Sequence, residues 1–199
     1  ASAEAVVRRM CEQIAHTWRQ HRDDIDAGSL GNQERDLLEG RTPFVDPMEA
    51  PNSLARLCEL LEKSTGKRCI VLLDEYDTPL HEAWVGGFWH EVSEFVRAFF
   101  NASFKSNPSM ERALLTGITR VARESIFSDL NNPKVVSATS PEYATSFGFT
   151  QDEVFAAMEE FGLRERDQVK DWYDGFTFGG MPDIYNPWSI TNYLDSGRF

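Results

Sequence analysis

The 199-residue sequence carries 20 Lys and Arg residues against 32 Asp and Glu, a formal net charge of −12, and 41% of its residues are hydrophobic. This composition is typical of a soluble globular protein with a substantial core. The negative charge repels phosphate backbones and anionic lipid, and no basic cluster offsets it, so we expect no direct nucleic-acid or membrane binding. No run approaches the ~20 consecutive apolar residues of a membrane helix. Three widely spaced cysteines in apolar patterns suit a reducing compartment, and we expect a cytoplasmic protein.

The first third of the sequence has the pattern of amphipathic helices. Apolar residues at helical spacing predict one helix over residues 2–22 and a shorter, more polar one over 33–39. A leucine stripe predicts a third helix, which begins at Asn52 or Ser53 and ends near Gly66.

Two short apolar runs predict parallel strands joined by a helix. Residues 69–73 read Cys-Ile-Val-Leu-Leu, a continuous run typical of a parallel strand that is covered on both faces. A loop that carries Pro79 and a pair of glycines should follow, and then a helix over 88–104. Residues 113–117 form the second run, so this part of the sequence predicts a right-handed βαβ unit.

The last third of the sequence is aromatic-rich and mainly helical in pattern. We expect a third short strand at 135–138 and, further on, a turn at 175–182. The predicted helices cover residues 150–161, 167–173 and 187–194. The sequence therefore predicts a small helical subdomain after the sheet region.

Polar residues follow both predicted strands. Asp74, Glu75, Tyr76 and Asp77 come directly after the first strand, and the second leads into Thr116–Arg120. Because the carboxyl ends of neighbouring parallel strands meet at one crevice, we expect these groups to lie together.

An apolar run followed by Asp-Glu is the sequence pattern of a Walker B strand. The aspartate, here Asp74, holds hydrated Mg²⁺ beside nucleotide phosphates, and the next residue, Glu75, polarises the attacking water. Thr116, Thr119 or Arg120 on the adjacent strand would then sense or stabilise the γ-phosphate. The alternative is that Asp74 and Glu75 are solvated acids at a strand end, and that Arg120 is a surface arginine.

Two other kinds of site have little support in the sequence. A phosphate-binding loop needs G-x-x-x-x-G-K-[ST], and the single Gly-Lys pair, Gly66-Lys67, precedes a strand and lacks the earlier glycine. His81 and His90 have no zinc-ligand spacing and are interpreted as surface or helix-face residues.

Several separate blocks of this sequence, in one order, resemble the AAA-ATPase-like domain proteins of the P-loop NTPase superfamily. The blocks are Ile70–Leu80, Thr116–Val121, Glu124–Asn132, Phe147–Thr150, Trp172–Gly175 and Tyr185–Ile190. The resemblance is dense from about Gly66 to Leu194 and loose over residues 1–65. Proteins of this family are often joined to a C-terminal PD-(D/E)xK-type nuclease domain.

The resemblance implies an incomplete P-loop-type parallel sheet over residues 1–139 and a helical lid or adaptor over 140–199. It implies ATP and Mg²⁺ as cofactors, with Asp74 as the metal residue, Glu75 and Arg120 as catalytic residues, and Thr116 and Thr119 at the nucleotide. The implied partners are an upstream P-loop segment and a C-terminal nuclease domain of a longer parent chain. No mechanism can be derived for residues 124–132.

This sequence departs from the family at both ends. It begins after the place of the P-loop and ends before any nuclease domain, so we expect an interior fragment that binds ATP weakly or not at all and shows no turnover. One alternative is a non-catalytic regulatory module with a degenerate ATPase fold. Another, weaker one is a metal-dependent phosphoesterase built on Asp74, Glu75 and Asp77.

Overall fold

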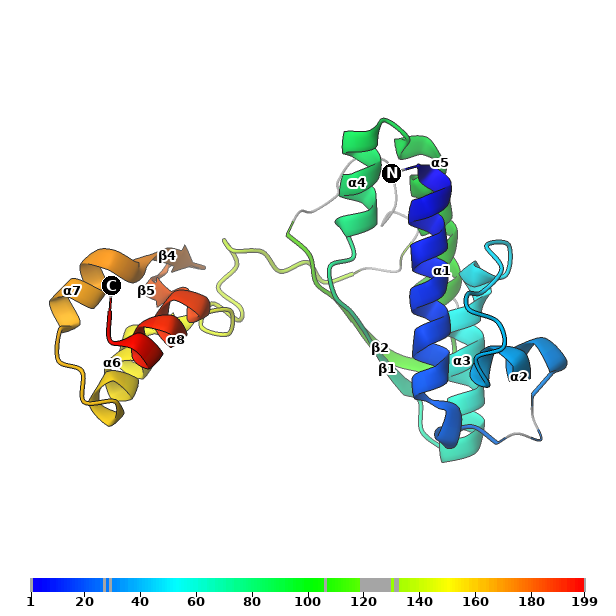
Figure 1. Ribbon diagram of the computed structural model, residues 1–199, viewed down its shortest axis with the longest axis horizontal. Helices are drawn as coiled ribbons and strands as arrows, with labels where there is room; N and C mark the ends of the chain where they lie inside the picture. The colour runs from blue at the N-terminus through cyan, green and yellow to red at the C-terminus, as the bar shows by residue number, and fades with distance from the viewer. Residues whose placement is uncertain are drawn as a thin grey trace. The chain divides into compact units, whose positions relative to one another are not determined.

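The computed structural model describes residues 2–26, 28, 30–105, 107–118, 130 and 133–198. The chain forms two compact units, Ala1–Pro133 and Lys134–Phe199, here called unit 1 and unit 2 (Figure 1). The described residues form eight α-helices, a two-stranded parallel sheet and a three-stranded antiparallel sheet, which confirms a mixed α/β protein. The P-loop fold, and the division into a core over 1–139 and a lid over 140–199, stay predictions.

Unit 1 consists of helices beside a short parallel sheet. In chain order its elements are α1 (Ala3–Gln20), a 3₁₀ turn (Arg22–Asp24), α2 (Asn32–Leu38), α3 (Ala50–Thr65), β1 (Cys69–Leu73), α4 (Thr78–Gly86), α5 (Trp89–Phe100), a π-helical turn (Asn101–Lys105) and β2 (Met110–Leu115). The three predicted N-terminal helices are confirmed. Helix α3 starts earlier than predicted, because Pro51 suits the first turn of a helix, and it ends at Gly66 in the left-handed conformation.

Helix α4 lies where the sequence predicted a loop. Pro79 stands in its first turn, a position where the missing N–H costs nothing, and the left-handed Gly87 (φ 77°) ends it. Leu80 and Ala83 are fully buried, so this short helix is held by its contact with the core. The prediction was wrong because proline and glycine mark helix ends as well as loops.

The core of unit 1 lies among its helices. Helices α1, α3 and α5 contact one another, and α4 contacts α1 and α5 (Figure 1). Trp18 is buried at the centre, and its Nε1 donates to Ser53 Oγ of α3 at 2.9 Å. No described helix combines the length and the apolar character that a membrane crossing requires.

The two strands of unit 1 are parallel neighbours, as predicted. Leu72 pairs with Leu114 in a register that runs to the end of both strands, although β2 begins and ends earlier than expected. Cys69, Val71 and Leu73 are half-buried, whereas Ile70, Leu72 and Leu114 on the other face are 63%, 73% and 58% exposed. Within the described residues the sheet is therefore covered on one face, and the expectation of two covered faces was wrong.

Unit 2 combines helices with an antiparallel sheet. Its elements are β3 (Phe149–Thr150), α6 (Gln151–Glu160), α7 (Arg166–Tyr173), β4 (Asp174–Phe178), β5 (Met181–Tyr185) and α8 (Pro187–Ser196), with the strands in the order β3-β5-β4. All three predicted helices are confirmed, and their inner faces surround the buried Met158, Tyr185 and Tyr193. The small helical subdomain that was predicted also contains a three-stranded sheet, which was not predicted, and the third strand expected at 135–138 does not form.

The β4–β5 hairpin replaces the turn that was predicted between two helices. Phe178 pairs with Met181, so the loop is the two residues Gly179 and Gly180, both with positive φ (55° and 86°). Two adjacent residues of positive φ are what a tight hairpin turn requires, and Gly-Gly supplies them without steric cost. The signal was present in the sequence as Gly-Gly between apolar residues.

Candidate site for nucleotide and magnesium at the end of the parallel sheet

Backbone hydrogen bonds carry the parallel ladder past the last strand residues. Thr116 N–H donates to Leu73 O at 2.9 Å, and Tyr76 N–H donates to Thr116 O at 3.0 Å. These bonds hold the chain after β1 against the chain after β2. The prediction that Asp74 and Thr116 lie at the same edge of the sheet is therefore confirmed.

Asp74 is the centre of this edge. Its Oδ1 accepts hydrogen bonds from the Thr116 hydroxyl and from Glu75 N–H, the latter at 3.0 Å. Its Oδ2 makes no hydrogen bond within the described residues, and the side chain is exposed. One carboxylate oxygen is thus oriented by the protein, and the other has no hydrogen-bond partner among the described residues.

Glu75 takes a left-handed backbone conformation, with φ of 51°. A residue with a Cβ enters this region at a cost of about 1–2 kcal/mol, and such residues are concentrated at functional sites. The side chain is exposed and makes no hydrogen bond or ion pair to any described residue. The tight turn therefore presents a carboxylate with open acceptor positions beside Asp74.

Asp77 differs from its acidic neighbours because it is 6% exposed. It precedes α4, and its backbone carbonyl accepts from His81 N–H at 2.8 Å. In the alternative phosphoesterase, Asp77 stands with Asp74 and Glu75 as a carboxylate of the site. Burial separates it from the exposed Asp74 and Glu75.

The remaining predicted site residues lie outside the described part of the chain. They are Thr119 and Arg120, whose proposed roles at the γ-phosphate stay predictions. The block 124–132, for which no role was derived, also lies outside the described part except for Leu130.

The carboxylate oxygens at Asp74 suit a magnesium ion that keeps most of its water ligands. Mg²⁺ prefers oxygen ligands and keeps several waters, so proteins usually hold it through one or two carboxylates and the phosphates of a nucleotide. Asp74 offers a free carboxylate oxygen with this chemistry. Among the described residues no group of three or more His, Cys, Asp or Glu side chains is arranged to enclose a metal. The site fits a hydrated ion shared with a ligand.

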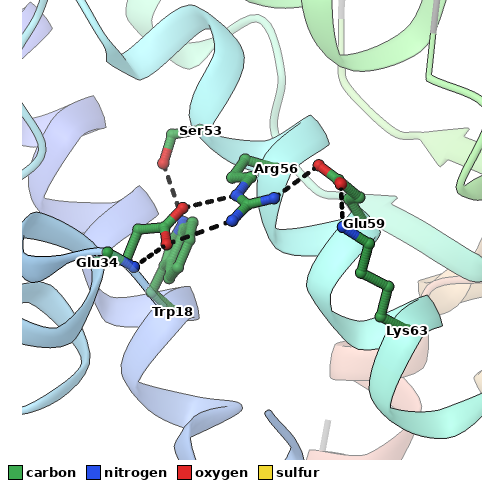
Figure 2. A network of polar contacts seen from close by, with 7 residues as sticks. Trp18, Glu34, Ser53, Arg56, Glu59 and Lys63 are labelled. Atoms are coloured by element: carbon green, nitrogen blue, oxygen red, sulfur yellow. Dashed lines mark hydrogen bonds and ion pairs between the residues drawn. The ribbon is translucent and has the colours of Figure 1, made fainter. Parts of the chain in front are cut away.

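Figure 2 shows a second polar network, which the sequence analysis missed, between α2 and α3 of unit 1. Arg56 Nε donates to Glu34 Oε1 at 2.6 Å, and its Nη1 lies 2.9 Å from an oxygen of Glu59, which also pairs with Lys63. Burial tends to raise the pKa of Glu34, but hydrogen bonds from Arg56 and from Gly31 N–H outweigh it and lower that pKa. The i,i+3 and i,i+4 spacing of Arg56, Glu59 and Lys63 was visible in the sequence.

A cavity of about 440 Å³ lies beside this network. It is lined by α2, by the segment 42–49 and by the start of α3, including Glu34, Ser53 and Arg56. None of its lining residues belongs to the edge formed by Asp74 and Thr116. The cavity and the candidate site are thus separate features of unit 1.

Other titratable side chains behave as the sequence suggested. His81 and His90 are exposed. The three cysteines are free, and burial raises the pKa of Cys11 and of Cys69 to about 11, so both thiols are protonated at neutral pH. These thiols pack as small apolar groups.

Comparison with known proteins identifies the family. A family model described as a predicted AAA-ATPase matches residues 1–127, a range that contains Asp74, Glu75 and Thr116. The chain is 32% identical over 151 residues to a protein of Azotobacter chroococcum mcd 1 named "Uncharacterized protein in vnfD 5'region". That match covers 73% of this chain but 29% of the relative. No solved structure matches. The chain belongs to the predicted AAA-ATPase family.

Proposed function

We propose that this chain forms part of an ATPase that binds ATP and hydrolyses it with Mg²⁺ in a longer parent protein. The observation that carries the proposal is the convergence of Asp74, Glu75 and Thr116 at the carboxyl end of two adjacent parallel strands. This is the edge at which open α/β sheets bind ligands. Membership of the family favours the same activity.

Each residue has a distinct role in this proposal. Asp74, through its free Oδ2, would hold the hydrated ion, and Thr116 would keep the carboxylate in position by donating to Oδ1. Glu75 would orient and polarise the attacking water, because its carboxylate is exposed and has open acceptor positions. Thr119 and Arg120 would act on the γ-phosphate. Magnesium, when bound, would supply the neutralisation of phosphate charge that the carboxylates of Asp74 and Glu75 cannot.

We infer that an upstream segment of the parent protein supplies phosphate binding, because no P-loop sequence occurs in these 199 residues. Following the resemblance of the sequence blocks, we further propose that unit 2 is a lid or adaptor and that the ATPase regulates an attached nuclease-like effector. The absence of a P-loop sequence favours one alternative, a regulatory module that does not turn over ATP.

Turnover by the full-length protein separates these two functions. Glu75→Gln keeps the size and hydrogen-bonding capacity of the side chain but removes the charge that polarises water, so the rate should fall by about 10²–10⁴ while ATP still binds. Glu91→Gln, at an exposed carboxylate without contacts to other described residues, is the matched control and should hydrolyse ATP normally. Equal turnover by wild type and Glu75→Gln, or no turnover by the wild type, would favour the regulatory module.

A further inference from the structure

The buried carboxylate of Asp77 packs directly against the backbone of Gly117. A Cβ on Gly117 would lie 2.6 Å from Asp77 Oδ1 and 2.8 Å from Cε1 of Tyr76, closer than side-chain carbons approach such atoms. Asp77 cannot retreat easily, because it is 6% exposed. Glycine is therefore the residue that allows this contact.

This contact lies one residue from the candidate site. Gly117 follows Thr116, whose hydroxyl donates to Asp74 and whose carbonyl accepts from Tyr76 N–H at 3.0 Å. The Tyr76 ring also packs on Phe100 of the core, with ring centroids 6.4 Å apart. A continuous series of contacts thus joins Asp77 to the backbone of Gly117, to the Thr116 hydroxyl and to Asp74.

We propose that Asp77 and Gly117 form a brace that positions the Thr116 hydroxyl on Asp74 and so prepares Asp74 to hold the magnesium of Mg·ATP. Asp77 is then a positioning residue, distinct in role from the exposed Asp74 and Glu75. The inference rests on the proposed ATPase function. Its defining feature is the packing of the buried Asp77 carboxylate against Gly117, which leaves no room for a Cβ.

Supporting side chains of this kind influence metal affinity strongly, and their loss typically weakens it by about 10–100-fold. Two variants of the full-length protein test the brace: Gly117→Ala and Asp77→Ala. Binding of Mn²⁺ in the presence of ATP, followed by electron paramagnetic resonance, reports the metal site without turnover. Circular dichroism establishes that each variant is folded, and Asp77→Ala carries the test if Gly117→Ala does not fold.

We expect Gly117→Ala and Asp77→Ala to bind Mn²⁺ at least about 10-fold more weakly than the wild type. Wild-type affinity in both folded alanine variants would overturn the brace.

A second measurement separates this inference from the proposed function. If the wild-type protein binds no metal with ATP, the proposed function fails, and amide hydrogen exchange in the 199-residue chain still tests the brace. Exchange at Thr116 and Tyr76 should be faster in Asp77→Ala than in wild type, because both amides belong to the braced segment. Unchanged exchange would contradict the brace.

Discussion

The network around Arg56 provides a quantitative test of what holds unit 1 together. Replacing Arg56 by Leu removes the guanidinium that donates to Glu34 through Nε at 2.6 Å and through Nη2 at 3.4 Å. Glu34 then remains between α2 and α3, with the Gly31 N–H as its one remaining donor among the described residues. Its carboxylate is 22% exposed, so water replaces the lost donors incompletely.

The expected cost follows from these contacts. Hydrogen bonds to charged groups contribute about 1.5–3 kcal/mol each when buried. Arg56 is 34% exposed, and solvent screening reduces that contribution, so we expect a loss of about 1–2 kcal/mol of unfolding free energy. For a unit of this size the loss corresponds to a fall in melting temperature of about 3–8 °C.

Thermal denaturation followed by circular dichroism at pH 7 measures this loss. The matched control is Arg41→Leu, because Arg41 pairs with Asp36 and Glu39 but is 56% exposed, and its removal should cost less than about 1 kcal/mol. Equal melting temperatures for the Arg56 and Arg41 variants would refute the reasoning.

The pH dependence of the same variant supplies an independent check. The folded pKa of Glu34 is lowered, so its contribution to stability is present above the ordinary value of 4.5 and is lost as the pH falls through the lower, folded pKa. The difference in melting temperature between wild type and Arg56→Leu should therefore become smaller as the pH falls below 4.5. A difference that is constant from pH 7 to pH 3 would contradict the electrostatic account.

Two further predictions concern unit 2. Burial and the neighbouring Asp183 raise the pKa of Asp174 above 3.8, so the contribution of Asp174 to stability is lost as the pH rises through the folded pKa. Asp174→Asn should remove this loss and raise the melting temperature at pH 7. A melting temperature below that of the wild type would contradict this account. Gly179→Ala places a Cβ 2.2 Å from Ser140 O at a φ of 55°, so it should cost at least about 2 kcal/mol in urea denaturation. Gly180 also has positive φ, but a Cβ added there would meet no atom within 4 Å, so Gly180→Ala should lower the unfolding free energy less than Gly179→Ala does. A larger loss in Gly180→Ala would refute the steric argument.

The elements that could be predicted are those whose signal is local. The run Cys69–Leu73 and the acids after it predicted a parallel strand that ends at a ligand-binding edge, and β1 and β2 pair as expected. The signals at Pro79 and at Gly179-Gly180 were equally local, but each has two structural meanings. Pro79 begins a helix where a loop was predicted, and the Gly-Gly turn joins two strands that were not predicted. Whether such a signal becomes a helix start, a hairpin turn or a loop depends on how the neighbouring segments pack against distant residues.

What could not be predicted depends on contacts between distant parts of the chain. Trp18 reaches Ser53 across 35 positions, and Arg56 reaches Glu34 across 22, with no spacing rule to connect them. At the candidate site the sequence placed Asp74 beside Thr116, but it did not distinguish the buried Asp77 from its exposed neighbours. Burial is a property of the folded chain, so the sequence could not show that Asp77 is buried while Asp74 and Glu75 are exposed.

The central claim is that Asp74 holds the magnesium of a bound nucleotide, and calorimetric ATP binding to the full-length protein tests it most directly. Titrations with and without Mg²⁺ would compare the wild type with Asp74→Asn, and with Asp23→Asn as an exposed control. We predict that Mg²⁺ strengthens ATP binding by the wild type and by Asp23→Asn, whereas Asp74→Asn binds ATP with the same affinity in both conditions. An Asp74→Asn protein that retains the full magnesium effect would contradict the claim.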